Sequence, residues 1–232
     1  MKSLLCALLF IPGILFSQSV FENAEKLFRQ QKYNDAKALF ETLLKDQPND
    51  LKILEYLGDI NGISKNWDAA LVYYKKLKVL KPSNADYHYK YGGVLGMIAN
   101  ESNKFKALGM IDDIKQSFQK AIELNPKHID ARWALVEFYL KLPGIIGGSE
   151  TKATRYANEL LTISPIDGYL AKGRIAEYFE RYKEAEKLYK IAIQIGSSKI
   201  CYQKLSDLYK NKMNQPEKAK QIMAEFDQKT KS

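Results

Sequence analysis

The chain has 232 residues, of which 46% are hydrophobic and 27% charged, enough for a core of one or two domains. Its formal net charge is +9, but the lysines are spread along the chain, which argues against a nucleic-acid partner. Two cysteines and two histidines supply no Cys/His pair at zinc-ligand spacing, so we expect no metal and no cofactor.

The first 19 residues differ from the rest of the chain. Lys2 is a minimal charged region, residues 4–16 form an apolar run, and Ser17 to Ser19 supply small residues in an A-x-A-like pattern. This pattern is typical of a secretory signal peptide, and the run is short for a membrane span, which needs about 20 apolar residues. We predict a signal peptide at 1–19, cleaved after Ser17 or Ser19, with a retained anchor as the alternative.

Export has consequences for the rest of the chain. Cleavage after Ser19 removes Lys2, which lowers the formal charge from +9 to +8, and leaves Cys201 as the one cysteine. A single cysteine cannot form an internal disulfide, so packing must hold the fold. We expect a bacterial periplasmic or cell-envelope protein with no integral membrane span after cleavage and no nucleic acid as partner.

From residue 20 onward the sequence repeats with a period of 34 residues. The pairs at this spacing are Ala24 and Gly58, Tyr33 and Trp67, Ala36 and Ala70, Phe40 and Tyr74, and Pro48 and Pro82. Such a period, with small residues at set points and a proline at the end, is the signature of a solenoid of helix pairs. Unit one covers about 20–50, with helices expected near 20–31 and 34–45, and unit two covers 51–84.

Units three and four depart from the period. In unit three, 85–128, the distance from Pro82 to Pro126 is 44 residues, so about ten residues are inserted near 100–111. We expect this insert to lengthen both helices of the unit. Unit four, 129–167, has 39 residues between prolines, which places a shorter insert in the loop at 141–148. Because a solenoid stacks equivalent turns on one edge, we expect the two inserts to be neighbours.

Units five and six complete the array. Unit five, about 168–199, is regular again. Unit six, about 200–227, keeps only an outline of the pattern and is followed by a polar tail, as expected for a capping repeat whose outer face meets water. The sequence therefore predicts an all-α chain of six helix pairs and no second domain.

Five residues of unit two carry a family resemblance. Leu57, Gly58, Ala70, Tyr74 and Pro82 resemble the tetratricopeptide repeat. The resemblance covers most of the chain after the signal peptide. It implies a right-handed α-solenoid and a scaffold that binds a protein or peptide partner in its concave groove. Small residues at Gly58 and Ala70 would let the paired helices approach closely.

The pattern also departs from the family in places. The family has a Trp before the Leu and a Tyr after the Gly, where this chain has Leu54 and Asn61. The family's carboxylate-clamp version needs Lys and Asn at positions that hold Phe21 and Glu25 here, and Lys90 alone does not replace them. We therefore reject the clamp.

One face of each first helix lines the groove in the family. By that register the candidate partner groove contains Glu55, Asp59, Tyr89, Gly93, Gly96, Trp133, Arg174 and Tyr178. Gly62 falls on the same face. Glycine inside a helix costs about 1 kcal/mol relative to alanine, so something is expected to approach the backbone here. A peptide partner is one occupant, and the chain's own insert at 100–111, folded over Gly93 and Gly96, is the one we expect.

No arrangement of residues predicts catalysis. His88 fills the slot that the family gives to Trp and is expected to pack, while His128, beside Pro126, is expected to be solvated. Asp112 and Asp113 are adjacent, so on a helix they point in different directions and cannot act as a pair. We predict a non-enzymatic scaffold for protein–protein interaction. The alternatives are an envelope protein that binds a glycan or anionic polymer, and an accessory subunit of an envelope enzyme complex.

A second candidate site lies before the second helix of unit four. Gly147 and Gly148 precede Ser149, with Lys152 one turn later. Backbone N–H groups at a helix start can hold an anion. The simpler interpretation is a tight turn followed by a serine N-cap, and the spacing is not that of a phosphate-binding P-loop.

Overall fold

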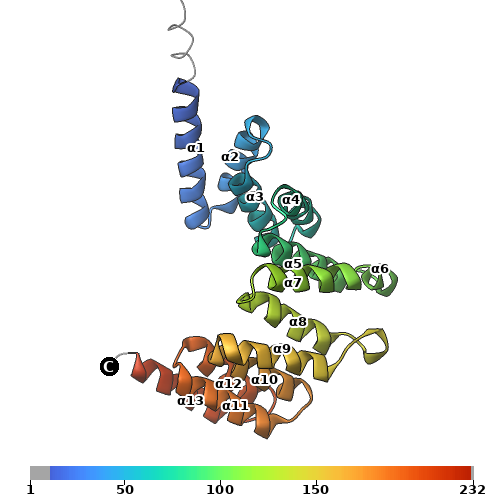
Figure 1. Ribbon diagram of the computed structural model, residues 1–232. Coiled ribbons are helices and arrows are strands. Elements are labelled where there is room, and N and C mark those ends of the chain that lie inside the picture. Colours follow the sequence, from blue (N-terminus) through green and yellow to red (C-terminus); the bar gives the residue numbers. More distant parts are fainter. Residues whose placement is uncertain (1–10, 231–232) are drawn as a thin grey trace, which may run out of the picture. The chain divides into compact units, whose positions relative to one another are not determined.

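The computed structural model describes residues 11–230, with side chains from Ser19 onward, and in this range it is all-α (Figure 1). The first helices of the six pairs are α1 (Ile11–Arg29), α3 (Leu51–Ile63), α5 (Ala85–Glu101), α8 (Ile129–Lys141), α10 (Pro165–Tyr178) and α12 (Lys199–Asn211). The second helices are α2 (Tyr33–Asp46), α4 (Trp67–Leu80), α7 (Ile111–Leu124), α9 (Glu150–Ile163), α11 (Tyr182–Ile195) and α13 (Pro216–Lys229). The predicted all-α architecture of six helix pairs is confirmed.

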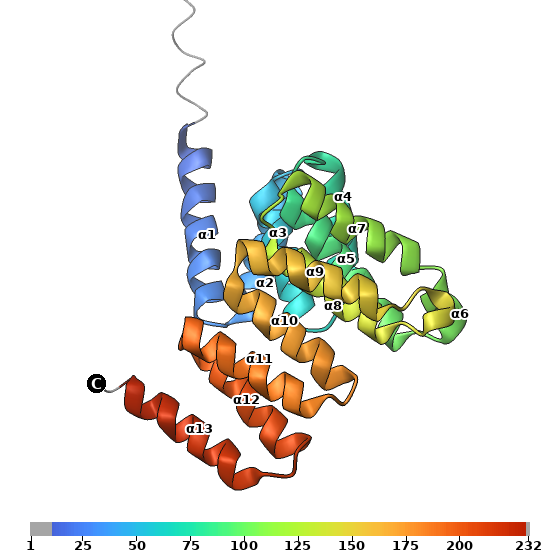
Figure 2. The same ribbon diagram turned by 60° about the horizontal axis from the view of Figure 1, so that its bottom comes forward.

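The described part of the chain divides into two compact units, with the boundary between Ser117 and Phe118. In the first, a core cluster joins the first two helix pairs around Ala24, Phe40 and Leu57. In the second, α10, α11, α12 and α13 lie in order against one another (Figure 2). Tyr189 and Tyr202 are fully buried in the core of this unit.

The turn between paired helices uses the same backbone conformation in four repeats. Gln31, Lys65, Glu180 and Asn214 all have positive φ, between 53° and 61°. Gln31 and Lys65 are one period apart, as are Glu180 and Asn214. The left-handed region is uncommon outside glycine, so its recurrence marks a defined turn rather than an irregular loop. Repeats three and four instead connect their helices through α6 (Lys104–Leu108) and a 3-10 helix, η1 (Gly144–Ile146).

The insert of the third repeat lengthens one helix and adds another. Helix α5 has 17 residues against 13 in α3, so the expected lengthening of the first helix is confirmed. Helix α7 has 14 residues, the same as α4, so the expected lengthening of the second helix is wrong. The chain leaves α5 at Ser102, which is extended, and Asn103 then caps the short helix α6 through its side-chain oxygen.

The N-terminal helix passes through the predicted cleavage positions. Residues 1–10 of the predicted signal peptide lie outside the described residues, and α1 begins at Ile11. Val20 and Phe21 pack against the core cluster of the first unit, so these contacts remain if the chain is cut after Ser19. Among the described helices, none has the length and apolar content needed to cross a membrane.

His128 is buried, so the expectation that it is solvated is wrong. Only 6% of the residue is exposed, and its Nδ1 accepts a hydrogen bond from the backbone N–H of Ala131 at 3.2 Å. Its backbone oxygen accepts from the guanidinium of Arg132 at 3.1 Å. His128 is thus the N-cap of α8, a role that its position after Pro126 did not reveal. His88 is half-buried, with Nε2 2.8 Å from the backbone oxygen of Pro82.

The capping role of His128 predicts that two substitutions at this position lower stability by different amounts. His128→Ala removes the side-chain acceptor and should lower the free energy of unfolding by about 1 kcal/mol or more. His128→Asn keeps an acceptor that caps helices well, so its loss should be smaller. Urea unfolding of the two variants measures both values. A larger loss for Asn than for Ala would show that the cap is not what the imidazole contributes.

Candidate partner-binding surface

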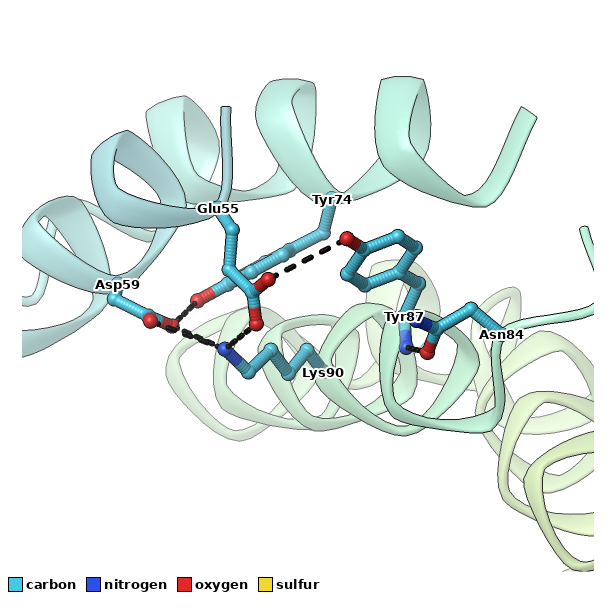
Figure 3. Close-up of polar contacts among 6 residues, drawn as sticks. All are labelled: Glu55, Asp59, Tyr74, Asn84, Tyr87 and Lys90. Atoms are coloured by element: carbon cyan, nitrogen blue, oxygen red, sulfur yellow. Dashed lines mark hydrogen bonds and ion pairs between the residues drawn. The ribbon is translucent and has the colours of Figure 1, made fainter. Parts of the chain in front are cut away.

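A polar cluster joins the first helices of the second and third repeats. Lys90 of α5 extends its ammonium to α3, where Nζ lies 2.7 Å from Glu55 and 2.8 and 3.0 Å from the two oxygens of Asp59 (Figure 3). The three side chains are between 24% and 34% exposed. Two carboxylates share one ammonium, so the cluster has a net charge of −1 when all three groups are ionised.

Two tyrosine hydroxyls hold the carboxylates from the other side. Tyr74 of α4 donates to Asp59 at 2.5 Å, and Tyr87 of α5 donates to Glu55 at 3.4 Å (Figure 3). Burial, followed by the nearby carboxylate charges, raises the pKa of Tyr74 and raises the pKa of Tyr87 to about 12. Both phenols therefore stay protonated at neutral pH and act as donors.

The environment of Lys90 contains two opposing effects on its pKa. Burial lowers the pKa, but hydrogen bonds and charge from Asp59 and Glu55 outweigh burial, and the net pKa is raised. Lys90 is therefore a fixed cation that links α3 to α5. Sequence reasoning named Glu55 and Asp59 but assigned Lys90 no role. The signal that could have found it is the 31-residue spacing from Asp59, slightly less than one repeat.

The predicted groove glycines are open. A Cβ added to Gly62, Gly93 or Gly96 would have no atom within 4 Å beyond its own helix backbone and chain neighbours. The expectation that the insert at 100–111 folds over Gly93 and Gly96 is therefore wrong. The insert is instead taken up by the longer α5 and the capped helix α6.

The contact between α3 and α5 places these glycines on one surface. Gly62 lies one turn after Asp59 on α3, and Gly93 lies one turn after Lys90 on α5. Residues three apart on a helix share a face, so both glycines continue the surface that the ion pair begins. The residues that follow Gly62 and Gly96 in the sequence are large, apolar and exposed, since Ile63 is 49% and Met97 39% exposed. Tyr89, also predicted here, is half-buried.

A second pairing of first helices occurs in residues 118–232. Arg174 of α10 donates from Nε and Nη2 to the two oxygens of Glu137 on α8, at 2.8 and 3.3 Å. Lys141 approaches the same carboxylate at 3.7 Å. A two-point guanidinium–carboxylate contact fixes the relative rotation of the two side chains, so Arg174 links α8 to α10 as Lys90 links α3 to α5.

The two aromatic residues predicted for this face differ in their surroundings. The ring of Tyr178 lies 5.5 Å from the guanidinium of Arg174 and the residue is 41% exposed, which leaves it accessible to a partner. Trp133 packs against the core cluster of its unit, and its Nε1 donates to Asp167 at 2.9 Å. Trp133 therefore connects α8 to α10 and is only partly available on the surface.

Comparison with known proteins identifies the repeat. Residues 21–93 match the family model described as tetratricopeptide repeat. This part of the chain contains tetratricopeptide repeats. No curated protein matches the chain at a significant level. The matched range holds the polar cluster and Gly62, so this part of the candidate surface lies within the recognised repeats.

Solved structures extend the likeness to most of the chain. A thermophilic TPR protein from Thermus thermophilus has a TM-score of 0.65 at 17% identity, covering 86% of this chain and 98% of its own. PilW, a type IV pilus biogenesis factor, has a TM-score of 0.65 at 18% identity, with 90% and 91% covered. YrrB, a TPR protein with an unusual peptide-binding site, has a TM-score of 0.54 at 18% identity, with 78% and 87% covered. At these identities the likeness shows the fold alone.

The glycine pair between the helices of the fourth pair has a structural role. Gly147 has φ of 108°, in the left-handed region that favours glycine. A Cβ at Gly148 would lie 1.8 Å from the backbone oxygen of Leu142, which leaves no room for a side chain. Ser149 accepts from the N–H of Lys152 at 3.2 Å as the N-cap of α9. Turn geometry and capping thus account for this motif.

The residues that the structure describes contain no group of three or more His, Cys, Asp or Glu side chains that could hold a metal ion. Cys201 is fully buried in the core of residues 118–232 and forms no disulfide. Ion pairs and hydrogen bonds engage the charged side chains of the two clusters, which are Glu55, Asp59 and Lys90 in one and Glu137 and Arg174 in the other. Their arrangement suits a binding surface whose polar groups are held in fixed positions.

Proposed function

We propose that the protein is an exported, non-catalytic scaffold that binds a protein partner along the first-helix faces of its tetratricopeptide repeats. The fold supports this, because stacked helix pairs present extended surfaces that such proteins use for binding. A peptide-binding site in YrrB, which shares the fold, favours a peptide segment as the ligand class. The signal-like N-terminus supports export to a periplasm or cell envelope.

The observation that carries this proposal is the open backbone at Gly93 and Gly96. Gly58 illustrates a glycine with an internal use, since its Cβ position is filled by the ring of Tyr74. Among the described residues, no atom beyond the helix's own backbone and the chain neighbours lies within 4 Å of a Cβ built at Gly93 or Gly96. Glycine in a helix is destabilising by roughly 0.5–1 kcal/mol relative to alanine. A partner that approaches the helix backbone accounts for this cost.

The surroundings indicate how the partner binds. An apolar side chain of the partner rests on the glycine surface, and the exposed side chains of Ile63 and Met97 are available nearby in the sequence to contact it. The adjoining Lys90 cluster keeps its polar groups in place and adds a net negative charge, which favours a cationic residue at that end of the partner segment. Apolar burial contributes affinity and the cluster sets register, as in peptide grooves in general.

Filling the glycine surface tests the proposal. Gly93→Gln with Gly96→Gln places two side chains on the surface while favouring the helix, so the variant should be as stable as the wild type or more so. Affinity capture from the envelope fraction of the source organism should then lose at least one protein partner by tenfold or more. Ala38→Gln, at an exposed position on the second helix α2, is the matched control and should retain that partner.

A specific capture result would contradict the proposal. Equal recovery of every captured protein by wild type, control and the filled variant would exclude this surface as the binding site. Urea unfolding of each variant separates loss of binding from loss of fold, because a stable variant that fails to capture the partner has lost contact with it.

A further inference from the structure

Helix α6 carries large apolar side chains on its outer face. Phe105 is 88% exposed and Leu108 is 44% exposed. They are three residues apart, so they share a face of the helix. Ala107, on the other side, is half-buried, and α6 contacts α5. Figure 1 shows α6 at the far end of α5. The helix therefore has an inner side toward the repeats and an apolar outer side toward solvent.

The exposure of Phe105 is built into the local structure. Asn103 accepts from the N–H of Lys106 at 3.0 Å and so caps α6. Before it, the hydroxyl of Ser102 donates to the backbone oxygen of Ile98 at 2.7 Å, which ties the connection to the end of α5. These bonds orient the helix with its aromatic ring outward. The helix belongs to the residues that exceed the 34-residue period, so repeat stacking does not require it.

The charge around the ring is positive. Lys104 and Lys106 precede and follow Phe105 in the sequence and are exposed, and within the described residues neither lysine pairs with a carboxylate. The nearest acidic side chains in the sequence are engaged elsewhere. Glu101 accepts from the indole N–H of Trp67 at 2.8 Å, and Asp112 pairs with a lysine of its own helix at 2.6 Å. The outer face of α6 is thus aromatic and cationic.

We propose that α6 is a contact site for an anionic lipid surface. Phe105 and Leu108 enter the headgroup region, while Lys104 and Lys106 meet lipid phosphates. Aromatic and aliphatic side chains flanked by lysine are the combination that binds the interface of anionic bilayers, through apolar burial and attraction to the charged leaflet. Two lysines beside Phe105 in the sequence favour the surface of an anionic bilayer over an uncharged pocket of a protein as the binding partner. This inference does not depend on the proposed groove.

A local fluorescence probe tests the contact in the full chain. Phe105→Trp is mixed with vesicles of equal parts phosphatidylglycerol and phosphatidylcholine, and wild-type emission from the two native tryptophans is subtracted. The emission of the new indole should shift to shorter wavelength and should be quenched by brominated acyl chains. Both changes should be smaller at high salt than at low salt. Val72→Trp is the matched control, because Val72 is 65% exposed on α4 of the same compact unit. It should show neither change, even if the apolar N-terminus tethers the chain.

Affinity changes provide the second measurement. Phe105→Ser should weaken binding to these vesicles about tenfold, because one exposed aromatic side chain is no longer buried. Lys104→Gln with Lys106→Gln should weaken it by a similar factor and flatten its salt dependence. Circular dichroism confirms that the variants fold. Unchanged emission of Trp at 105 with anionic vesicles overturns the proposal, as does equal binding to pure phosphatidylcholine. Crosslinking from position 105 to a protein rather than to lipid also overturns it.

Discussion

Gly58→Ala is expected to lower the free energy of unfolding by about 1–3 kcal/mol, the usual cost of an overpacked core. The added Cβ would lie 2.7 Å from Cε1 of Tyr74. The ring cannot move aside easily, because Tyr74 is 4% exposed and its hydroxyl is bonded to Asp59. Gly173→Ala should have the same sign, since its Cβ would lie 2.3 Å from the ring of the fully buried Tyr189.

Substitution of the two open glycines in the third repeat is expected to have the opposite sign. Gly93→Ala and Gly96→Ala add a Cβ where no atom lies within 4 Å, so only the gain in helix propensity remains. Each should raise the free energy of unfolding by about 0.5–1 kcal/mol. Urea unfolding with linear extrapolation measures all four variants on one scale. Destabilisation by Gly93→Ala comparable to that by Gly58→Ala would show that the third repeat packs its first helix differently.

Lys90→Met is expected to lower the free energy of unfolding by about 1–3 kcal/mol. The variant leaves Glu55 and Asp59 close together without their shared cation, in a site where both are about one-third exposed. Solvent reduces the repulsion, so the cost falls below that of a fully buried unpaired charge. Lys75→Met, at an exposed position on α4, is the matched control and should change stability by less than about 0.5 kcal/mol.

Two further measurements separate repulsion from lost packing at Lys90. Adding Glu55→Gln to Lys90→Met should recover part of the loss, since one of the two unpaired charges is removed. The pKa of Lys90 is raised in the folded chain, so its stabilisation is present at neutral pH and is lost as pH rises above 10.5 through the folded value. The gap between wild type and Lys90→Met should therefore narrow at alkaline pH. A gap that stays constant would assign the loss to packing.

Local patterns in the sequence were sufficient to predict the paired helices and their order along the chain. The 34-residue period, the small residues and the prolines predicted six helix pairs, because each repeat buries its apolar face against the next in the same way. The departures from the period also located the connections that became α6 and η1. These features depend on packing within a repeat and between adjacent repeats that is the same along the array, and the period of the sequence contains that information.

The internal roles of individual residues were not predictable in the same way. Gly58 and Gly93 are both helical glycines in first helices, yet one faces a buried ring and the other faces open space. His128 follows a proline in a turn and is nevertheless a buried cap. In each case the neighbour that decides the role comes from packing between elements, and periodicity does not specify which side chain fills which gap.

The sequence by itself thus determined the class of fold and the number of helix pairs, and it predicted which face of each first helix binds a partner. Only the tertiary structure decided which residues of that face are engaged, because Lys90 meets Asp59 across 31 residues of chain and Arg174 meets Glu137 across 37. Ion pairs of this kind depend on the rotation and offset of neighbouring helices to within about an ångström, which side-chain packing sets and a repeat period does not.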